Sequence, residues 1–291
     1  MNPFPANLNK MKKIRFTKMV ATGNDFVVTE AKSLRLSGRQ EKPKAKNFNY
    51  LAEKICNRKY GVGADGLLVL EKSRKADIKM RIFNADGSEA EMCGNGARCA
   101  ALYLASRKPK AGNRKPKIET KAGILDSLVG KDSVRIKLTS PCGLKLGIPV
   151  LINGCRLEAN FINTGVPHAV IFVEGLDKID VAAIGSQIRY HKEFSPKGVN
   201  VDFVEAAGND SICVRTYERG VEGETLACGT GSVASALVFG LLTGDLAHRK
   251  INVRTQSGEI LKIYFDKKVN NFSNVWLEGK AEIVYKGEYY V

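Results

Sequence analysis

Two short segments of the sequence combine a cysteine with closely spaced glycines. They are Cys93-Gly94-Asn95-Gly96 and Cys228-Gly229-Thr230-Gly231. A thiol can act as an acid, a base or a nucleophile, and glycine lets a ligand approach the backbone closely. A single segment of this kind is more often a tight turn beside an ordinary buried cysteine. Two copies in one chain indicate a site that uses two thiols.

Each segment leads into a stretch that is apolar on nearly every side. The first stretch runs to Lys108-Pro109 and the second to Gly244-Asp245. A helix that is apolar all round is buried. We therefore expect one buried helix after each cysteine, at the centre of its own domain.

The start of such a helix suits both a carboxylate ligand and a reactive thiol. The first backbone N–H groups have no partner within the helix, and the positive end of the helix dipole lies there. The amides that could hold a carboxylate are those of Gly94, Asn95, Gly229 and Thr230. The same surroundings should lower the pKa of the adjacent thiol from about 8.5 toward neutrality. Cys93 and Cys228 would then exchange protons on opposite faces of one bound amino acid and invert its α-carbon.

Three blocks of sequence recur in the same order in the two halves of the chain. Thr22-Gly23 matches Thr164-Gly165, Gly61–Asp65 matches Gly198–Asp202, and Cys93-Gly94 matches Cys228-Gly229. The offsets, from 22 to 164, from 61 to 198 and from 93 to 228, are 142, 137 and 135 residues. Internal repetition in register indicates two copies of one structural unit.

Short segments rich in valine and isoleucine surround the two predicted helices. Turn residues separate them, so we read them as strands. The predicted strands cover residues 14–19, 66–70, 77–83, 133–138, 169–173, 211–216, 250–254 and 274–278. The expected fold is α+β with two homologous, pseudo-symmetric domains, each a curved, mostly antiparallel sheet around a central buried helix. We place the domains at residues 11–140 and 141–280, with a linker near Ser140–Gly143 and a polar extension at residues 1–10.

Composition and charge narrow the classes of protein. The 291 residues are comfortable for two domains, and no apolar run approaches the roughly 18 residues of a membrane span. The first residues lack the apolar core of a signal peptide, so we expect a cytoplasmic protein without a membrane partner. The net charge of +16 would allow nucleic-acid binding, but the basic stretches carry no recognisable nucleic-acid motif. We read them as solvated loops and expect no nucleic-acid partner.

The seven cysteines favour no disulfide framework and no metal site. Their number is odd, none forms a CxxC pair, and the chain has three histidines. Most should be free thiols buried as small apolar groups. Cys99, six residues after Cys93 on the predicted helix, fits this structural role better than a chemical one.

The two cysteine segments resemble the active-site segments of diaminopimelate epimerases. The matching motifs include Met92–Cys99, Ala227–Gly231, Gly23–Val27, Gly63–Gly66, Phe83–Glu89 and Tyr217–Gly220, and the resemblance runs from about Met11 to the C-terminus. It implies conversion of L,L- to meso-diaminopimelate, on the route to lysine and cell-wall peptide. It implies no pyridoxal phosphate, metal or nucleotide, and it allows a homodimer. It also implies that a last strand, residues 281–291, returns to complete the first domain.

The resemblance suggests roles for individual side chains. Cys93 and Cys228 would be the two bases, with His168 and Glu218 beside them to hold or move the thiol protons. The residues that would contact the ammonium and carboxylate groups of the substrate are Asn24, Asn84, Asn200 and Arg219. A guanidinium suits a distal carboxylate because it donates two parallel hydrogen bonds. Other interpretations remain: a turn at Asn84, a surface ion pair of Glu218 with Arg219, and a core position for His168.

Three departures from the family pattern leave the substrate open. Val166 stands where many relatives carry asparagine, Gly66 where some carry glutamine, and the loop 218–224 is one residue longer than the commonest form. A racemase of the same architecture that acts on another amino acid, such as histidine, is therefore one alternative. A basic nucleic-acid-binding protein that merely keeps the fold is another.

Overall fold

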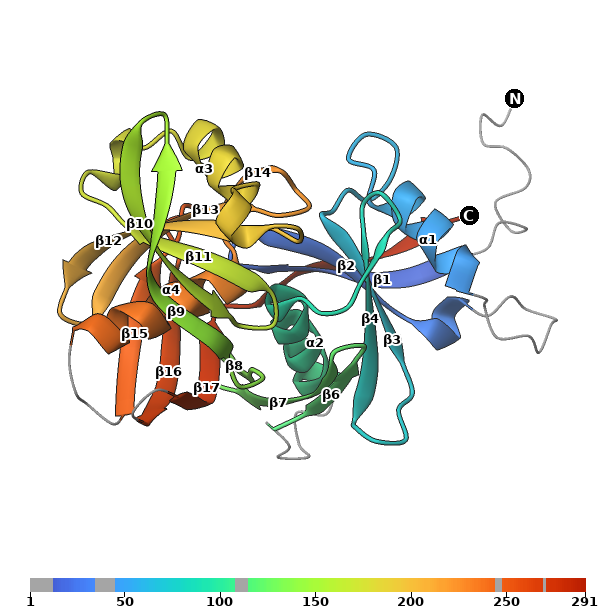
Figure 1. The fold of residues 1–291 in the computed structure, drawn as a ribbon. Helices are drawn as coiled ribbons and strands as arrows, with labels where there is room; N and C mark the ends of the chain where they lie inside the picture. Colours follow the sequence, from blue (N-terminus) through green and yellow to red (C-terminus); the bar gives the residue numbers. More distant parts are fainter. Residues whose placement is uncertain (1–12, 35–44, 108–114, 244–247, 269–270) are drawn as a thin grey trace, which may run out of the picture. The chain divides into compact units, whose positions relative to one another are not determined.

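A computed structural model describes residues 13–34, 45–107, 115–243, 248–268 and 271–291 (Figure 1). The chain divides into two compact units. The first unit comprises residues 1–129 and 281–291, and the second comprises residues 130–280. The expected polar extension, residues 1–10, lies outside the described part of the chain.

The first unit is one sheet with two α-helices. Its elements are β1 (Lys13–Ala21), β2 (Asn24–Glu30), η2 (Ala31–Leu34), α1 (Ala45–Ile55), β3 (Gly66–Glu71), β4 (Ile78–Asn84), β5 (Glu89–Ala90), α2 (Gly94–Arg107), β6 (Lys117–Thr120), β7 (Gly123–Val129) and β18 (Glu282–Tyr290). The strand order is β18-β1-β2-β3-β4. β5 and β6 then pair with different parts of β4, and β7 pairs with β6.

The second unit repeats this arrangement with longer strands. Its elements are β8 (Val134–Lys137), β9 (Cys142–Ile152), β10 (Cys155–Asn163), β11 (Pro167–Phe172), η4 (Leu176–Lys178), α3 (Val181–Arg189), η5 (Lys192–Phe194), β12 (Asn200–Gly208), β13 (Ser211–Glu218), β14 (Gly223–Thr225), α4 (Gly229–Leu242), β15 (His248–Arg254), β16 (Ile260–Lys268) and β17 (Asn271–Gly279). The strand order begins β9-β10-β11-β12-β13. β14 and β15 then pair with different parts of β13, and the sheet continues from β15 in the order β15-β16-β17-β8.

The pairing pattern confirms the predicted duplication. β2 with β3 and β11 with β12 are parallel pairs, and each pair is bridged by a helix, as a parallel connection requires. β3 with β4 and β12 with β13 are antiparallel, and β4 with β6 and β13 with β15 are again parallel. The remaining pairs in both units are antiparallel. Two homologous α+β units with mostly antiparallel sheets are therefore present.

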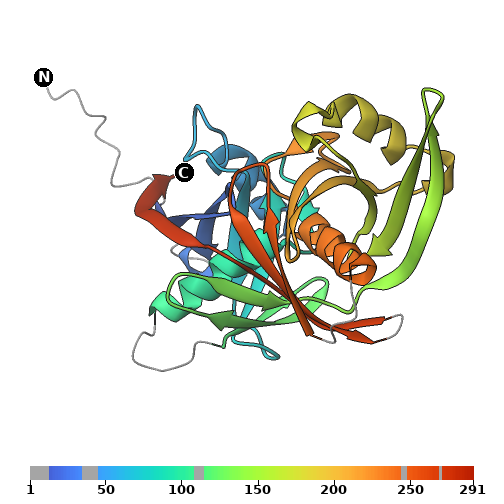
Figure 2. The same ribbon diagram turned by 90° about the vertical axis from the view of Figure 1, so that its left-hand side faces the viewer.

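The predicted central helices are also present. In α2 residues 95–101 are buried, and in α4 residues 231–240 are buried. α2 contacts strands β1, β2, β3, β4, β6, β7 and β18, and α4 contacts seven strands of its own unit. Figure 2 shows α4, in orange, with strands of the second unit around it.

A second helix covers the other face of each sheet, and the sequence analysis did not predict it. α1 packs its apolar side on one cluster with β1, β2 and β3, and α3 packs on another with β9–β13 (Figure 1). Since both faces of the sheet are covered, β3 is buried along five consecutive residues, 66–70.

The boundary between the units lies eleven residues before the expected one. It falls at Val129/Gly130, because β8, assigned to the first domain from the sequence, pairs with β17 of the second unit. The predicted linker at Ser140–Gly143 instead leads into β9. The last strand, β18, pairs with β1 and lies in the first unit.

Candidate active site

Cys93 directly precedes the first residue of α2. Its thiol is half-buried, and the Gly96 N–H donates to Sγ across 3.4 Å. A Cβ added at Gly94 would meet no described atom within 4 Å. The backbone at the start of α2 is therefore open to a ligand, as the glycine at this position predicts.

A chain of hydrogen bonds fixes two of the three predicted asparagines of the first unit, Asn24 and Asn95. Arg98, which is fully buried, donates to Asn95 Oδ1 and to Thr22 Oγ1, each at 2.7 Å. Asn95 Nδ2 donates to Asn24 Oδ1 at 2.5 Å, and Asn24 Nδ2 donates to Asp65 Oδ2 at 3.2 Å. Arginine can only donate and a carboxylate can only accept. The orientation of both amides is therefore set by the two ends of the chain.

An ion-pair cluster anchors the carboxylate end of this chain. Arg58 Nη2 lies 2.7 Å from Asp65 Oδ1, and Arg58 also binds Asp25 through both of its terminal nitrogens. Lys18, almost entirely buried, lies 2.7 Å from Asp25 and donates to the Gly63 carbonyl. Burial raises the pKa of Asp25, but hydrogen bonds from Arg58 and Lys18 outweigh it and hold the pKa well below its ordinary range.

Asn84 occupies a turn at the end of β4. Its side chain is exposed and donates to Ser88 Oγ at 2.9 Å, and its backbone N–H donates to Ser88 O. The structure therefore gives Asn84 the turn contacts that its sequence context predicts. It brings Asn24 and Asn95 together, and Asn84 is not hydrogen-bonded to either.

Cys228 directly precedes α4 in the second unit, in the position that Cys93 has in the first. It is 7% exposed, and the Gly231 N–H donates to its thiol. Burial, then the charges of Glu218 and Asp202, raise the pKa of this thiol well above its ordinary value. The expected lowering is thus wrong for Cys228, because desolvation outweighs the hydrogen bonds from Thr230 and Gly231 at the helix start.

His168 is fully buried between two hydrogen-bonding partners. Its Nδ1 lies 2.7 Å from Asp202 Oδ2, and its Nε2 lies 3.0 Å from Thr230 Oγ1. Thr230 Oγ1 in turn lies 3.4 Å from Cys228 Sγ. Asn200 Nδ2 approaches His168 Nε2 at 3.4 Å and donates to Pro167 O at 3.2 Å. The structure therefore brings four predicted site residues, Cys228, Thr230, His168 and Asn200, together.

Glu218 and Arg219 follow each other at the end of β13 but do not form an ion pair among the described residues. Burial raises the pKa of Glu218. The Arg219 backbone N–H donates to Asn200 Oδ1 at 2.8 Å, and its Nη1 donates to Lys197 O at 3.4 Å. Within the described chain this guanidinium has no carboxylate partner, so its charge remains available for an anionic group of a ligand.

An arginine–glutamate pair precedes each cysteine, and the sequence analysis missed both pairs. Arg81 binds Glu89 through Nε at 2.7 Å and Nη2 at 2.9 Å, across β4 and β5. Arg215 binds Glu224 through Nε at 2.7 Å and Nη2 at 2.8 Å, across β13 and β14. Each glutamate stands four residues before its cysteine. Two parallel hydrogen bonds fix geometry as well as charge, so each pair holds the hairpin that delivers the thiol.

The other residues that the sequence analysis missed had a visible signal. Asp65 and Asp202 close the repeated block Gly61–Asp65 and Gly198–Asp202, in which only Asn200 had been given a role. Arg98 lies on a helix predicted to be buried all round, where a charged side chain needs a polar partner.

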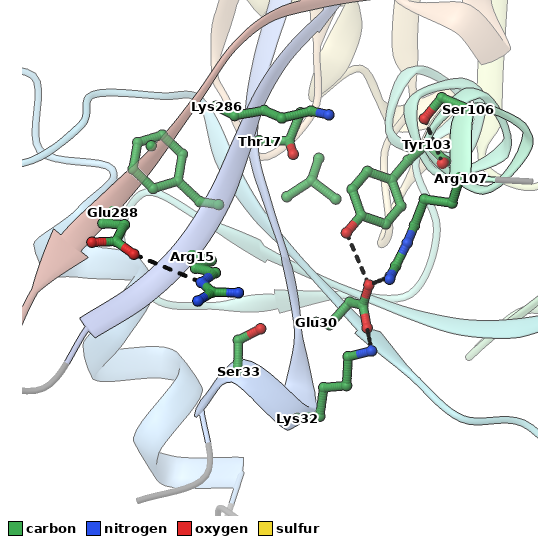
Figure 3. Close-up of a pocket in the computed structure, with 13 residues that line it drawn as sticks. Arg15, Thr17, Glu30, Lys32, Ser33, Tyr103, Ser106, Arg107, Lys286 and Glu288 are labelled. Atoms are coloured by element: carbon green, nitrogen blue, oxygen red, sulfur yellow. Dashed lines mark hydrogen bonds and ion pairs between the residues drawn. The ribbon is translucent and has the colours of Figure 1, made fainter.

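The cavity drawn in Figure 3 lies in the first unit but away from the predicted site residues. Its volume is about 600 Å³, and residues of β1, β2, η2, β18 and the last turns of α2 line it. Glu30 accepts from Tyr103 Oη at 2.9 Å and pairs with Arg107 and with Lys32 (Figure 3). Cys93 precedes the opposite end of α2, a helix of 14 residues that spans about 21 Å. This cavity is therefore not the candidate active site.

The described residues contain neither a metal-binding cluster nor a membrane-spanning helix. No three histidine, cysteine, aspartate or glutamate side chains among them gather as a metal-binding group. No helix in this part of the chain is long and apolar enough to cross a membrane. All seven cysteines lie within the described residues, and none forms a disulfide.

Solved structures with this fold come from several enzyme families. A phenazine biosynthesis protein of the PhzF family from Bacillus anthracis has a TM-score of 0.72 at 20% identity, over 97% of this chain and all of that one. A hydroxyproline epimerase from Agrobacterium vitis has a TM-score of 0.68 at 14% identity, over 96% of this chain and 91% of the other. At these identities the likeness establishes the fold alone.

Sequence comparison is more specific. A family model described as diaminopimelate epimerase matches residues 16–141 and 160–284. The chain is 43% identical to a diaminopimelate epimerase from Methanocella arvoryzae over 96% of its own length and 97% of the relative. It is 41% identical to another from Aquifex aeolicus, over 94% and 97%. The chain belongs to the diaminopimelate epimerase family.

Proposed function

We propose that this protein converts L,L-diaminopimelate to meso-diaminopimelate by exchanging a proton at one α-carbon between two cysteines. The reaction is an isomerisation without pyridoxal phosphate, metal or nucleotide. It serves the formation of lysine and of peptidoglycan precursors, and we place it in the cytoplasm. The relatives at 43% and 41% identity carry the name of this enzyme.

The observation that carries the chemistry is the equivalent placement of two thiols. Cys93 and Cys228 each precede a buried helix, and each receives an N–H from the residue three positions later. Proton exchange with inversion needs a base on one face of the carbon and an acid on the other. Two thiols at equivalent helix starts are suited to these two roles.

Each turnover requires the two thiols to differ in protonation. The thiolate takes the α-hydrogen, the carbanion takes a proton from the other thiol, and the protonation states of the cysteines are then exchanged. Burial raises the pKa of the Cys228 thiol well above its ordinary value, which supports an initial role as the acid. We assign to His168 and Glu218 the role of holding or moving the proton of Cys228. His168 reaches the thiol through hydrogen bonds, and Glu218 acts on it through its charge.

Substrate binding falls to the helix starts and to side chains around them. The amides of Gly94, Asn95, Gly229 and Thr230 would hold the carboxylate at the reacting carbon and stabilise the charge that develops there. The side chains of Asn24, Asn84, Asn200 and Arg219 would bind the remaining polar groups of the substrate. Arg219, which has no carboxylate partner among the described residues, is the candidate for the distal carboxylate.

A racemase for another amino acid is the second candidate, and two departures from the family pattern support it. Val166 offers no side-chain amide beside the site. A Cβ at Gly66 would lie 2.9 Å from Phe83 O and 3.4 Å from the Phe26 ring, so the chain cannot simply accept the glutamine of some relatives. Substrate profiling separates the two candidates.

The test is proton NMR of the reduced protein in D₂O with L,L-diaminopimelate and no added cofactor. We expect loss of the α-proton signal and appearance of the meso isomer, and neither with Cys93→Ala or Cys228→Ala. Exchange with a different amino acid but not with diaminopimelate would remove the substrate assignment and keep the thiol mechanism. The absence of exchange with any amino acid would refute the proposed function.

A further inference from the structure

The second unit contains a continuous hydrogen-bonded path from the thiol to a buried carboxylate. It runs from Cys228 Sγ to Thr230 Oγ1 at 3.4 Å, from Thr230 Oγ1 to His168 Nε2 at 3.0 Å, and from His168 Nδ1 to Asp202 Oδ2 at 2.7 Å. Thr216 Oγ1 donates to the other carboxylate oxygen at 2.8 Å. His168 and Asp202 are both fully buried.

The acceptor end of this path sets the direction of its hydrogen bonds. A carboxylate only accepts, so His168 Nδ1 carries the ring proton and Nε2 is left with a lone pair. The Thr230 hydroxyl then donates to Nε2, and its oxygen accepts from the Cys228 S–H. Every bond in the path is thereby polarised away from the sulfur.

We propose that the Thr230 hydroxyl carries the proton between Cys228 and His168, and that Asp202 is the positioning residue that holds His168 ready to accept it. The S–H bond breaks as a new O–H bond forms on Thr230, whose own hydroxyl proton moves to His168 Nε2. The products are a thiolate and an imidazolium, and threonine is unchanged. The reverse transfer returns the proton to the sulfur.

The transfer conserves the charge of a buried site. Before it, the thiol and the imidazole are neutral and Asp202 is negative. After it, thiolate, imidazolium and carboxylate again sum to one negative charge. A net change of charge in a desolvated site is costly, and a transfer over two hydrogen bonds avoids that change. The imidazolium lies 2.7 Å from its counter-ion. Besides Asp202, Glu218 is the acidic group that acts on both Cys228 and His168, and burial raises its pKa.

The backbone at the start of α4 is shaped around this path. A Cβ at Gly231 would lie 2.2 Å from Asp202 Oδ1 and 3.2 Å from Thr216 Oγ1. Asp202 therefore packs against the helix start, where only glycine leaves room for its carboxylate. Gly231 therefore leaves room for the carboxylate of Asp202, in addition to its part in the turn.

This inference rests on the proposed function only in assigning Cys228 to the reaction. When Cys228 acts as the base it must first lose its proton, and His168 Nε2 is the nearest acceptor on the path. The route predicts that a hydroxyl at position 230 matters more than the size of the side chain.

The first test compares Thr230→Ser, which keeps the hydroxyl, with Thr230→Val, which replaces it by a methyl group. We expect the serine variant to isomerise within about tenfold of the wild type and the valine variant to be slower by about 10²- to 10⁴-fold, the usual range for a lost proton-transfer group. Ser235→Ala is the matched control. It removes a buried hydroxyl of the same helix that has no hydrogen-bond partner among the described residues, and it should be close to wild type. Equal rates for the serine and valine variants would overturn the relay.

Two further measurements need no substrate and therefore stand apart from the proposed function. The first is alkylation of Cys228 by iodoacetamide in a Cys93→Ala background, followed by mass spectrometry of the peptide that contains it. Thr230→Val should slow alkylation near pH 7 by at least about tenfold relative to Thr230→Ser, and the difference should narrow as pH rises. If the two variants are alkylated at the same rate at every pH, Thr230 does not assist deprotonation.

The second measurement is ¹⁵N NMR of the three histidines. We expect the proton of His168 on Nδ1 in the wild type and on Nε2 in Asp202→Asn, because the new amide can donate to Nδ1. A wild-type His168 with its proton on Nε2 would refute the role of Asp202. If the wild type fails to exchange the α-proton of diaminopimelate while both of these readouts behave as expected, the proposed substrate is wrong and the relay stands.

Discussion

Replacing Glu89 with glutamine removes the negative charge from the arginine–glutamate pair that precedes Cys93. Hydrogen bonds from Arg81 and then from Lys121 outweigh burial and lower the pKa of Glu89 from the ordinary 4.5 to about 2. That difference corresponds to about 3 kcal/mol. The side chains of Arg81 and Glu89 are both 14% exposed, so solvent screens part of the interaction. We expect the substitution to lower the free energy of unfolding by about 1–2 kcal/mol at neutral pH.

The pH dependence gives the sharper readout. Because the folded-state pKa of Glu89 lies below its unfolded-state value, its contribution is complete above about pH 4.5 and is lost as pH falls from 4.5 toward 2. The wild type should therefore lose stability through this window faster than Glu89→Gln, and their curves should converge near pH 2. Urea unfolding followed by far-UV circular dichroism at several pH values measures this difference. Parallel curves across the window would refute the reasoning.

Glu224→Gln is the matched control in the second unit. Arg215 also donates to the carbonyls of Leu176 and Ile179, at 2.9 and 3.0 Å, so its guanidinium stays anchored when the glutamate is neutralised. Among the described residues Arg81 makes no such carbonyl contact, and its other contacts are a second carboxylate, Glu71 at 3.9 Å, and the rings of Phe48 and Phe83. The cost of Glu224→Gln should therefore be smaller than that of Glu89→Gln. A larger cost would show that the backbone carbonyls do not hold Arg215.

Four further substitutions, two of them combined in one variant, test three other regions of the protein. The Asp65 carboxylate accepts hydrogen bonds from three donors. In Asp65→Asn the new amide N–H would face one of these donors, so the free energy of unfolding of the first unit should fall by about 1–3 kcal/mol. Adding Asn24→Asp to the Asp65→Asn variant should restore part of that loss, because the hydrogen bond between the two side chains can then run in the opposite direction. If urea unfolding shows that the losses of the two single variants simply add in the double variant, Asn24 does not donate to Asp65. Gly185→Ala would bring a Cβ to 2.6 Å from Tyr217 Cβ and should lower the free energy of unfolding by about 1–3 kcal/mol. Unfolding of the second unit can be followed by the fluorescence of its single tryptophan. An unchanged free energy of unfolding would mean that α3 shifts freely to accommodate the methyl group. Arg219→Lys should raise KM for diaminopimelate about tenfold or more with a smaller change in kcat, because lysine cannot donate two parallel bonds to a carboxylate; an unchanged KM would remove Arg219 from the binding site.

The features that the sequence predicted correctly are local or repeated. Both central helices follow from all-round apolar patterning next to a cysteine–glycine turn, and both begin at the glycine after the cysteine. The eight predicted strands coincide with β1, β3, β4, β8, β11, β13, β15 and β17, and three of them, at β4, β8 and β11, extend one residue beyond one or both ends of the observed strand. The repeat predicted two units although the pairing of the strands was unknown, because duplicated blocks in register require duplicated structure.

The features that the sequence did not predict depend on register between distant segments. His168 and Asp202 meet because β11 and β12 pair in parallel with His168 opposite Asn200, which places Asp202 two residues further along the same face. That register cannot be read from either segment alone. The domain boundary failed for the same reason, since the pairing of β8 with β17 joins segments about 140 residues apart.

The pKa of Cys228 illustrates a competition that local sequence cannot settle. The helix start favours the thiolate, as the sequence suggested, and the hydrogen bond with the Thr230 side chain acts in the same direction. Burial and the charges of Glu218 and Asp202 oppose it and prevail. The sign of the shift therefore depends on tertiary packing around the sulfur.

The two units share a backbone but surround their thiols differently, and the two-base reaction that we propose gives a reason for this. Two positions after the cysteine, Asn95 joins a fixed chain of amides, whereas Thr230 joins a path to an imidazole. Five positions after it, a buried Arg98 in the first unit corresponds to a valine in the second. An exchange of one proton between two thiols requires one to be ionised while the other is not. Identical surroundings would give both thiols the same intrinsic affinity for a proton, so side chains that diverge on a duplicated backbone suit the two-base reaction that we propose.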